Sequence, residues 1–430
     1  MTDANKITDG ITDGIEARKQ RGLQIAAKAK ISKRDDGSWT VPSQTGKCRY
    51  AVSVGQRPHC TCQDHEIRAC KCKHIYAVEF VIERESNSDG TETITQSLTV
   101  TESVTRPTYS QDWPAYNAAQ TNEKAQFQIL MHQLCRNVPE PEYKGNGRPR
   151  LPIADAIFAA AFKVFSTVSG RRFISDLCDA QVKGYISKVP HFNSIFNYLE
   201  MPSVTPILQS MIEQSTLPLR SVESDFAVDA TGFASTRFAR WFNFKYCEEK
   251  IAKEWIKLHL VCGVKTNIVT GVEVTGRFEH DSPYLPGLVE KTAKNFAVRE
   301  ISADKGYHSR DNYNAIVAAG AAPYIPFKTT SKLDVDTSNR GCKIDHSTLW
   351  SKMYHLYHFK RDEFLPHYHK RSNVESTFMS IKAKFGDAVR SKTPVAQTNE
   401  VLCKVLCHNV CVNIQSMYEL GIQPDFGLVA

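Results

Sequence analysis

Three acidic residues in the second half of the 430-residue chain lie where carboxylates could hold metal ions. Asp229 follows the apolar run FAV and Asp304 follows EISA, so each is expected at the end of a strand. Gly232 and Gly306 then favour a break in the chain. Glu375 lies on an expected helix. Two carboxylates at strand ends and a third on a helix can hold two divalent cations about 4 Å apart. Such oxygen ligands favour Mg²⁺ or Mn²⁺ over zinc.

The helix around Glu375 has a polar stripe beside an apolar one. Four residues fall on its polar stripe: Tyr368, Arg371, Glu375 and Lys382. The neighbouring stripe can anchor the helix in a core and consists of Val374, Phe378, Ile381 and Phe385. A carboxylate between two cations could thus be held toward a phosphate backbone. The alternative is a capping box, with Ser372 as N-cap and Glu375 at the third helical position.

Each aspartate also has a plainer interpretation. An Asp that follows a strand is often a turn former or the N-cap of the next helix. The joint occurrence of Asp229 and Asp304 with Glu375 favours a shared metal site over three unrelated structural roles.

A second group of possible metal ligands crowds the segment PHCTCQDHEIRACKCKHIY. Zinc takes about four nitrogen or sulfur ligands in a tetrahedron, and two ligands two positions apart can supply two corners. The candidates form two such pairs, Cys60 with Cys62 and Cys72 with His74. Cys70 or His65 could replace a member of the second pair, because both lie close by. The polar surroundings TCQ and KCK give little reason to bury these thiols in an apolar core.

The composition is that of a globular protein with a basic surface. Hydrophobic residues make up 41% of the chain, enough for a large core. The 54 Lys and Arg exceed the 46 Asp and Glu, and a formal net charge of +8 fits a polyanionic partner such as nucleic acid. Thirteen cysteines, an odd number, argue against a secreted disulfide scaffold. The longest apolar stretch, ADAIFAAAF, is too short to span a membrane. We expect a cytoplasmic protein without a signal peptide.

Changes in composition divide the chain into six expected regions. In order they are a flexible segment (1–30), a β-rich zinc module (31–85), a Ser/Thr-rich linker (86–115), a helical region (116–220), an α/β region (221–420) and a tail (421–430). The helical region supports two interpretations, a helix-turn-helix DNA reader or a dimerisation unit.

Two patterns in the α/β region predict local structure without chemistry. The run EWIKLHLVCGVKTNIVTGVEVTG predicts a hairpin that turns near residues 265–267. Cys403, Cys407 and Cys411 recur every four residues among aliphatic side chains. This spacing predicts a buried helix stripe rather than another metal site.

The acidic segments resemble the motifs of a known enzyme family. VDATGF, ADKGYHS and YHKRSNVESTFMSIK are similar to the three acidic motifs of DDE transposases of bacterial and archaeal insertion sequences. The third fits the pattern Y-x2-R-x3-E-x6-K of insertion-sequence families four and five without a departure. This resemblance spans about residues 145–420. Over residues 35–85, the spacing C-x-C-x9-C-x-H resembles the SWIM zinc finger, a module associated with nucleic-acid or protein binding.

The resemblance implies an α/β fold with an RNase H-like catalytic core, a mixed central sheet flanked by helices. In such a core Asp229, Asp304 and Glu375 would ligate two Mg²⁺ or Mn²⁺ ions. Three further residues would contact DNA: Tyr368, Arg371 and Lys382. The N-terminal ligands Cys60, Cys62, Cys72 and His74 would hold one Zn²⁺. A compact core is expected, without a long β-rich insertion between the second and third acids. His280 and Asp281 also look like a family feature, with a helix N-cap as the expected role.

The sequence therefore predicts a DNA transposase. Such an enzyme cleaves the ends of its element and joins the 3′-hydroxyl to target DNA by two-metal-ion phosphodiester transfer. The expected partners are double-stranded DNA, namely the terminal inverted repeats and the target, and a second copy of the chain in a synaptic homodimer. The expected location is the cytoplasm, in association with the nucleoid. Two alternatives are a non-catalytic DNA-binding protein derived from a transposase and a metal-dependent nuclease without strand transfer.

Overall fold

The computed structural model describes most of the chain as two compact units that divide between Tyr109 and Ser110. The described residues are 17–43, 48–55, 57–68, 70–88, 111–140, 150–235, 254–333, 335–336, 343–344 and 348–427. Much of the expected flexible segment (1–16) and of the expected linker (89–110) lies outside them. Each unit has a hydrophobic core of its own.

The N-terminal unit is a small antiparallel sheet packed against helices. Its strands follow the order β1 (Ser32–Lys33), β2 (Trp39–Pro42), β3 (Arg49–Ser53) and β4 (His59–Cys60). A helix at residues 17–28 precedes the sheet, and α2 (Gln63–Arg68) and α3 (Lys73–Ser88) follow it. Apolar side chains of β2 and β3 bury against these helices because the alternation of a strand places them on one face. The first helix crosses α3 at Gly22, where a Cβ would lie 2.7 Å from Cβ of Tyr76.

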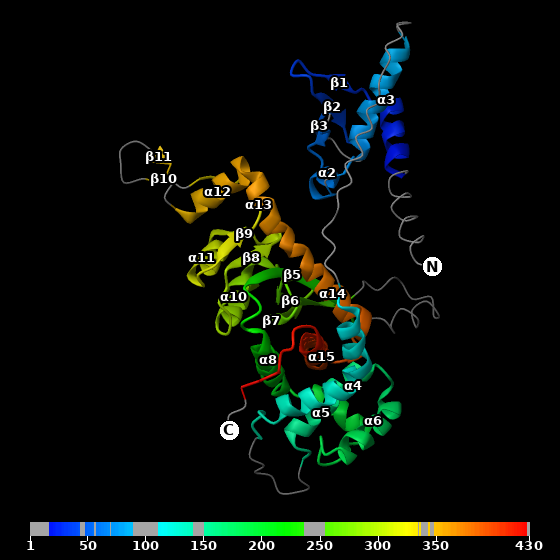
Figure 1. Cartoon of the computed structure of the whole chain (residues 1–430), viewed down its shortest axis with the longest axis vertical. Coiled ribbons are helices and arrows are strands. Elements are labelled where there is room, and N and C mark those ends of the chain that lie inside the picture. The colour runs from blue at the N-terminus through cyan, green and yellow to red at the C-terminus, as the bar shows by residue number, and fades with distance from the viewer. Residues whose placement is uncertain are drawn as a thin grey trace. The chain divides into compact units, whose positions relative to one another are not determined.

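A five-stranded mixed sheet forms the centre of the C-terminal unit (Figure 1). Its strands are β5 (Asp225–Ala234), β6 (Trp255–Gly263), β7 (Val269–Gly276), β8 (Glu300–Ala303) and β9 (Ala322–Tyr324). The order across the sheet is β7-β6-β5-β8-β9. The pairs β7–β6 and β6–β5 are antiparallel, whereas β5–β8 and β8–β9 are parallel. The predicted fold class is confirmed: a mixed sheet with helices, a helical middle region and a small N-terminal sheet.

Helices cover both faces of this sheet, and alternate side chains of β5 enter the two cores that these helices form. Phe226 and Val228 face one core, together with residues of β8, α10 (Leu285–Ala293) and α11 (Arg310–Ala318). Ala227 faces the opposite core, which the C-terminal helices α14 (Ser372–Phe385) and α15 (Pro394–Glu419) complete. Alternate residues of a strand point to opposite faces, so an unbroken apolar run is what a doubly covered strand requires.

The helices of the middle region share a core with the sheet and α15. They are α4 (Trp113–Cys135), α5 (Ile153–Ser166), α6 (Gly170–Val182), α7 (Phe192–Leu199) and α8 (Val204–Ser215). Figure 1 shows α15 nearly end-on beside α4, α5 and α8. Cys403 and Cys407 on α15 are fully buried and Cys411 is partly buried, as the spacing predicts. The expected boundary at residue 220 stays a prediction, because residues on both sides of it contribute to this core.

The predicted hairpin is confirmed, whereas two local predictions near the acidic residues are wrong. β6 and β7 pair around a turn in which Asn267 has a φ of 64°, a conformation that Asn tolerates. β5 does not end at Asp229 or break at Gly232, because β6 pairs with it as far as Ala234. Gly232 serves packing instead: a Cβ there would lie 2.0 Å from the ring of Trp255.

The capping box is also absent. Arg371 precedes the first residue of α14, and its φ of −54° and ψ of −31° are already helical. The chain reaches it through α13 (Arg361–Tyr368) and a 3₁₀ turn (His369–Arg371). No side chain caps the start of α14. Ser372 therefore cannot act as an N-cap, since the helical backbone already continues through it.

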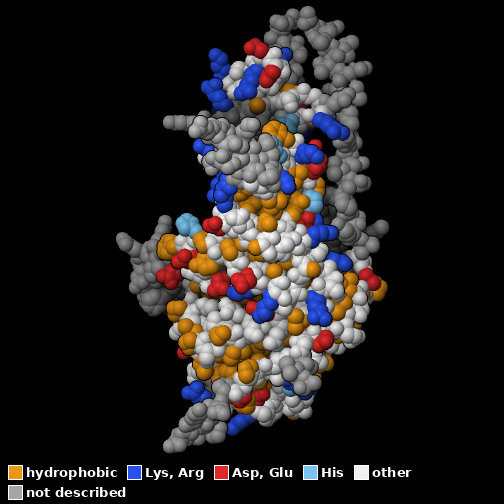
Figure 2. Space-filling model, turned by 90° about the vertical axis from the view of Figure 1, so that its left-hand side faces the viewer, with side chains coloured by type: hydrophobic (Ala, Val, Ile, Leu, Met, Phe, Trp, Pro, Cys, Tyr) orange, Lys and Arg blue, Asp and Glu red, His pale blue; other side chains and the backbone are white. Residues whose placement is uncertain are grey.

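The segment between the second and third acids adds little β-structure in its described part. The strands there are β9 and a separate pair, β10 (Val335–Asp336) and β11 (Lys343–Ile344). The helix α12 (Leu349–Phe359) then leads into α13. Figure 2 shows one face of the molecule, on which apolar, basic and acidic side chains are mixed. Among the helices formed by described residues, none is long and apolar enough to span a membrane.

Candidate catalytic and metal sites

Asp229 and Asp304 lie at the same end of the parallel pairing between β5 and β8. The register of β5 and β8 ends with Val228 opposite Ala303. Each aspartate is the next residue along its chain, so the two carboxylates leave the pairing at corresponding positions. β8 then turns into a 3₁₀ segment (Lys305–Tyr307), whereas β5 continues beside β6. Asp229 thus lies within a strand whose parallel partner has ended.

The helix α14 brings Glu375 to the same place. Its apolar stripe is buried as predicted, with Val374, Phe378, Ile381 and Phe385 in the core that also contains residues of β5. Glu375 in the first turn stays largely exposed, with 61% of its side chain accessible. Burial of one stripe of the helix therefore fixes the direction of its neighbouring polar stripe.

Arg371 joins two of the three acids directly. Its Nη1 donates to Oδ2 of Asp229 at 3.0 Å, and its Nη2 donates to Oε1 of Glu375 at 2.9 Å. The guanidinium fork can make both contacts at once because its donors diverge in one plane. Arg371 therefore lies between two carboxylates in a position that a metal cation could otherwise take.

The acids also influence one another electrostatically. Burial raises the pKa of Asp229, and the nearby charges of Asp304 and Glu375 act in the same direction. A hydrogen bond from the backbone N–H of Ala230 (2.8 Å) and the charge of Arg371 oppose that rise. The charges of Asp304 and Glu375 thus reach Asp229, and we call these three residues the acidic cluster. Among the described residues, however, the closely spaced group of possible metal ligands is the one at Cys60, Cys62, Cys72 and His74. A shared metal site at the acidic cluster stays a prediction.

The N-terminal unit brings together four possible metal ligands from β4, the start of α3 and the residues beside them. They are Cys60, Cys62, Cys72 and His74. Their possible ligand atoms all lie within 4.8 Å of one another, and all four residues are buried. Nδ1 of His74 is 3.9 Å from Sγ of Cys60 and 3.9 Å from Sγ of Cys72. A tetrahedral zinc ion with bonds of about 2.0–2.3 Å separates such atoms by roughly 3.5 Å. The cluster can therefore bind zinc with small adjustments.

The two alternative ligands lie elsewhere. Nδ1 of His65 is hydrogen-bonded to the backbone carbonyl of Cys70 at 2.7 Å, and Cys70 is outside the four-residue group. A hydrogen bond from Cys60 lowers the pKa of the Cys72 thiol well below its usual range. Burial raises the pKa of Cys62. A metal ion would supply the positive charge that lets several buried thiolates coexist.

Comparison with known proteins identifies the C-terminal region. Residues 220–410 match the family model of the transposase DDE domain. The chain contains a transposase DDE domain. The match includes Asp229, Asp304 and Glu375, and transposase activity in general follows from such a domain. No curated protein matches the chain.

The three polar residues predicted to contact DNA lie against the sheet of the DDE domain. Nζ of Lys382 donates to Oγ1 of Thr231 at 2.6 Å and lies 5.4 Å from the ring centre of Phe233. Burial lowers the pKa of Lys382 and raises that of Tyr368. Arg371 is paired with carboxylates as described above. Their contacts with DNA stay a prediction, but Arg371 and Lys382 both contact residues of β5.

Asp281 does not act as the expected helix cap. It precedes a 3₁₀ turn (Ser282–Tyr284), but its side chain makes no capping hydrogen bond. It accepts a hydrogen bond from Nζ of Lys257 at 2.9 Å instead, and Nδ1 of His259 lies 3.6 Å from it. His280 beside it is exposed. An ion pair with β6 outcompetes capping here because the lysine is largely buried and needs a counter-charge.

Tyr307 is a neighbour of the acidic cluster that the sequence reasoning missed. Its side chain is 1% exposed, and its hydroxyl has no hydrogen-bond partner among the described residues. Burial raises its pKa, and the charges of Asp229, Asp281 and Asp304 add to that rise. The signal was its position three residues after Asp304 in ADKGYHS, which is more often read as part of a turn.

Proposed function

We propose that the protein is a DNA transposase. In this proposal Asp229, Asp304 and Glu375 hold two Mg²⁺ or Mn²⁺ ions, which activate the attacking water or 3′-hydroxyl and stabilise the leaving oxygen. The enzyme cleaves the ends of its element and joins the freed 3′-hydroxyl to target DNA. The observation that supports the proposal is the pairing of Arg371 with both Asp229 and Glu375, within reach of the charge of Asp304, in a region that matches the transposase DDE domain.

The protein's own contribution is to position the DNA and to balance charge. Arg371 pairs with Asp229 and Glu375 and offsets one of their two negative charges. Divalent ions between these acids would repel the guanidinium and release it toward a DNA phosphate, which it can bind through two N–H groups. Lys382 lies farther along the same polar stripe and would contact the phosphate backbone of the same DNA. The shift of Arg371 would thus couple metal binding to DNA binding.

The remaining parts of the chain would supply recognition. We propose that Cys60, Cys62, Cys72 and His74 hold one zinc ion in a SWIM-type module, which binds DNA or another protein. The substrates would be the terminal inverted repeats and a target duplex. Two ends must be held together during transfer, so the active form would be a homodimer on DNA, associated with the nucleoid.

The decisive experiment uses labelled duplexes that carry the DNA flanking the gene of this protein. Incubation with the purified protein and Mg²⁺ should yield cleaved ends and joined products. Cleavage without joining would indicate a nuclease, and binding without cleavage would indicate a non-catalytic DNA-binding protein. Both outcomes would reject the transposase proposal.

The site assignment is tested with a matched pair of glutamates. Glu375 and Glu363 are both 61% exposed and both pair with a cation, but Glu363 lies outside the acidic cluster. Glu375→Gln should slow cleavage and joining by more than about 100-fold, because losing an outer-sphere partner alone costs 10–100-fold. Glu363→Gln should leave both rates within about twofold. Strand transfer that persists in Glu375→Gln would show that the assignment is wrong.

A further inference from the structure

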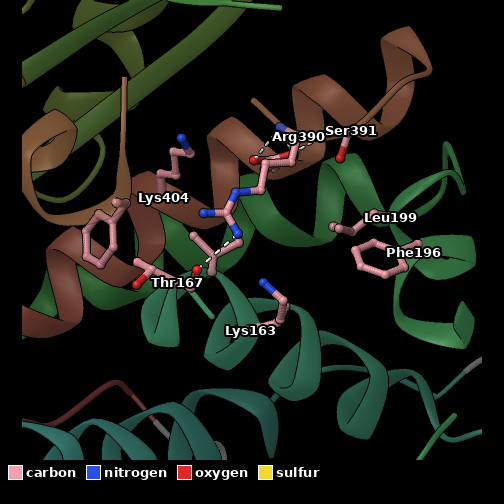
Figure 3. A pocket seen from close by; sticks show the side chains of 10 residues that line it. Lys163, Thr167, Phe196, Leu199, Arg390, Ser391 and Lys404 are labelled. Carbon is pink, nitrogen blue, oxygen red and sulfur yellow. Dashed lines mark hydrogen bonds between the residues drawn. The ribbon is translucent and has the colours of Figure 1, made fainter. Parts of the chain in front are cut away.

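A small pocket in the C-terminal unit lies away from the acidic cluster and is lined by cations (Figure 3). Helices α5 and α7, the loop after α14 and the start of α15 form its walls. Its charged side chains are Lys163, Arg390, Glu400 and Lys404, and Phe196 and Leu199 supply apolar wall. With one acid and three bases, the lining carries a formal charge of +2. The catalytic proposal uses none of these residues.

Lys163 is the unusual member of this set. It is 8% exposed, and its Nζ makes no hydrogen bond or ion pair with any part of the chain that the structure describes. In Figure 3 its amine and the guanidinium of Arg390 point into the same space. Burial and the charge of Arg390 lower the pKa of Lys163 to about 8, although the charge of Glu400 acts in the opposite direction. A buried ammonium without a partner is costly, so its retention points to a ligand.

The other charges of the pocket are already engaged. The carboxylate of Glu400 accepts hydrogen bonds from the backbone N–H groups of Arg390 and Ser391. Nζ of Lys404 donates to the carbonyls of Gly386 and Ala388. Arg390 donates Nη1 to the carbonyl of Thr167 at 3.0 Å, which leaves other N–H groups of its fork for a ligand. Lys163 and Arg390 are therefore the two groups able to bind an anion.

The volume of the pocket limits the size of the anion that it can hold. Its volume is about 50 Å³, whereas one water molecule needs about 10–15 Å³ on the same scale. The pocket thus has room for roughly four oxygen-sized atoms, the number that surrounds one phosphorus. A nucleobase is too large. Apolar walls lower the local dielectric and would strengthen a contact between a phosphate and the two cations.

We propose that this pocket binds one phosphate group of the DNA backbone, held between Lys163 and Arg390. The inference rests on the proposed action on DNA. The loop after α14, which carries Arg390, connects the pocket to the strand of Asp229. Its residues Asp387 and Val389 form backbone hydrogen bonds with Ala234 at the end of β5. Asp229 lies five residues earlier on β5, about 17 Å away at 3.3 Å per residue. At 3.4 Å per nucleotide, the separation of Asp229 from the loop that carries Arg390 corresponds to about five nucleotides along one strand. The pocket would thus set the register of the strand relative to the acids.

The test measures how the affinity for a duplex depends on KCl concentration. Neutralising one phosphate contributes about 0.9 to the slope of log affinity against log salt. Lys163→Met and Arg390→Gln should each reduce that slope by about one, and the double variant should also reduce it by about one, because both residues share one phosphate. Lys188 is exposed and outside the pocket, so Lys188→Gln should leave the slope unchanged.

A second readout separates binding from folding. Lys163→Met removes an unpaired buried charge and keeps the length of the side chain, so the midpoint of thermal unfolding should rise while DNA affinity falls. A lysine with a purely structural role would give a lower midpoint on substitution. That result would overturn the proposal.

The remaining outcomes are distinct. If the wild-type protein binds duplex DNA and the pocket variants keep its salt slope, the pocket inference is wrong while the proposed function stands. If the wild-type protein binds no DNA, the proposed function and the DNA phosphate both fail. Inorganic phosphate tests the other source of the ligand. If it raises the unfolding midpoint of the wild-type protein, if Arg390→Gln abolishes that rise, and if the pocket variants keep the wild-type salt dependence of DNA binding, the pocket is a site for free phosphate. That result would reject a phosphate of the DNA backbone.

Discussion

At the scale of single residues, Arg371 lies between two of the three acids that are proposed to bind metal. The sequence places it on the same helix face as Glu375, which suggests a role toward DNA. The structure pairs it with Asp229 and Glu375, two residues that the proposed mechanism needs for metal. Because a guanidinium and a dication cannot share those oxygens cheaply, metal binding must displace the arginine.

Replacement of Arg371 should therefore change metal affinity in the absence of DNA. We expect Arg371→Gln to bind Mn²⁺ about three- to tenfold more tightly, because a competing cation of about 1 kcal/mol is removed. Titration calorimetry or Mn²⁺ electron paramagnetic resonance measures the affinity. Arg299 pairs with Asp225 outside the cluster, so Arg299→Gln is the matched control and should bind as the wild type does. Unchanged or weaker binding in Arg371→Gln would contradict competition.

At the scale of elements, α14 positions Glu375 through its buried stripe. Ile381 is fully buried, whereas Met379 on the same helix is 74% exposed. The helix has no side-chain cap at its start, so packing rather than capping must hold it. The direction in which the polar stripe of α14 points therefore depends on the burial of its apolar stripe.

This dependence predicts a difference between two alanine variants of α14. Ile381→Ala should lower the free energy of unfolding by about 2–5 kcal/mol, because it leaves a cavity in the core. Met379→Ala should change it by no more than about 0.5 kcal/mol. Urea denaturation followed by circular dichroism measures both values. Equal effects of the two substitutions would mean that α14 is not held by this stripe.

The long helix α15 predicts a pH dependence of stability through His408. This histidine is 6% exposed, its Nε2 lies 2.9 Å from the carbonyl oxygen of Asn267, and burial lowers its pKa to about 4. The unfolded chain takes up a proton near pH 6.5 but the folded chain only near pH 4. The stability that comes from a neutral His408 is therefore complete above pH 6.5. It is lost as the pH falls to about 4, by about 3 kcal/mol in all.

His408→Gln removes that titration. Between pH 6.5 and 4, the unfolding free energy of the variant should decline less steeply than that of the wild type. The difference in slope should correspond to about one proton fewer taken up on unfolding. Burial also lowers the pKa of His308 to about 4, so part of the decline should persist in the variant. Denaturant titrations at a series of pH values provide the slopes. Identical slopes for the two proteins would reject a buried neutral His408.

At the scale of the whole molecule, the two compact units have separate cores and separate sets of proposed metal ligands. The four buried soft ligands belong to the N-terminal unit alone. The acidic cluster belongs to the C-terminal unit. Loss of one kind of metal should therefore leave the other unit intact.

Zinc removal should destabilise the N-terminal unit selectively. We expect one zinc ion per chain, and its removal by a chelator should lower one transition in differential scanning calorimetry while the other stays in place. Cys62→Ser should do the same. Metal content by mass spectrometry is the direct measure, and Cys70→Ser, outside the four-residue group, is the control. Zinc content that is unchanged in Cys62→Ser would show that packing holds the unit together.

The sequence by itself determined the chemical parts of this protein. The candidate ligands of the N-terminal cluster follow from short spacings, although the exclusion of Cys70 and His65 came from the structure. The apolar stripe of α14 follows from the helical period, and the cysteine stripe of α15 does too. These features depend on neighbours a few positions away, so local rules suffice.

Only the tertiary structure decided what depends on distant segments. β5 continues past Asp229 because β6, some thirty residues later, pairs with it. Arg371 meets Asp229 across the interface of α14 with the sheet, and Asp281 turns to Lys257 rather than to its own helix. The pocket around Lys163 and Arg390 joins residues more than two hundred positions apart. Pairing and burial across such separations are set by the free energy of the whole core, which no local pattern records.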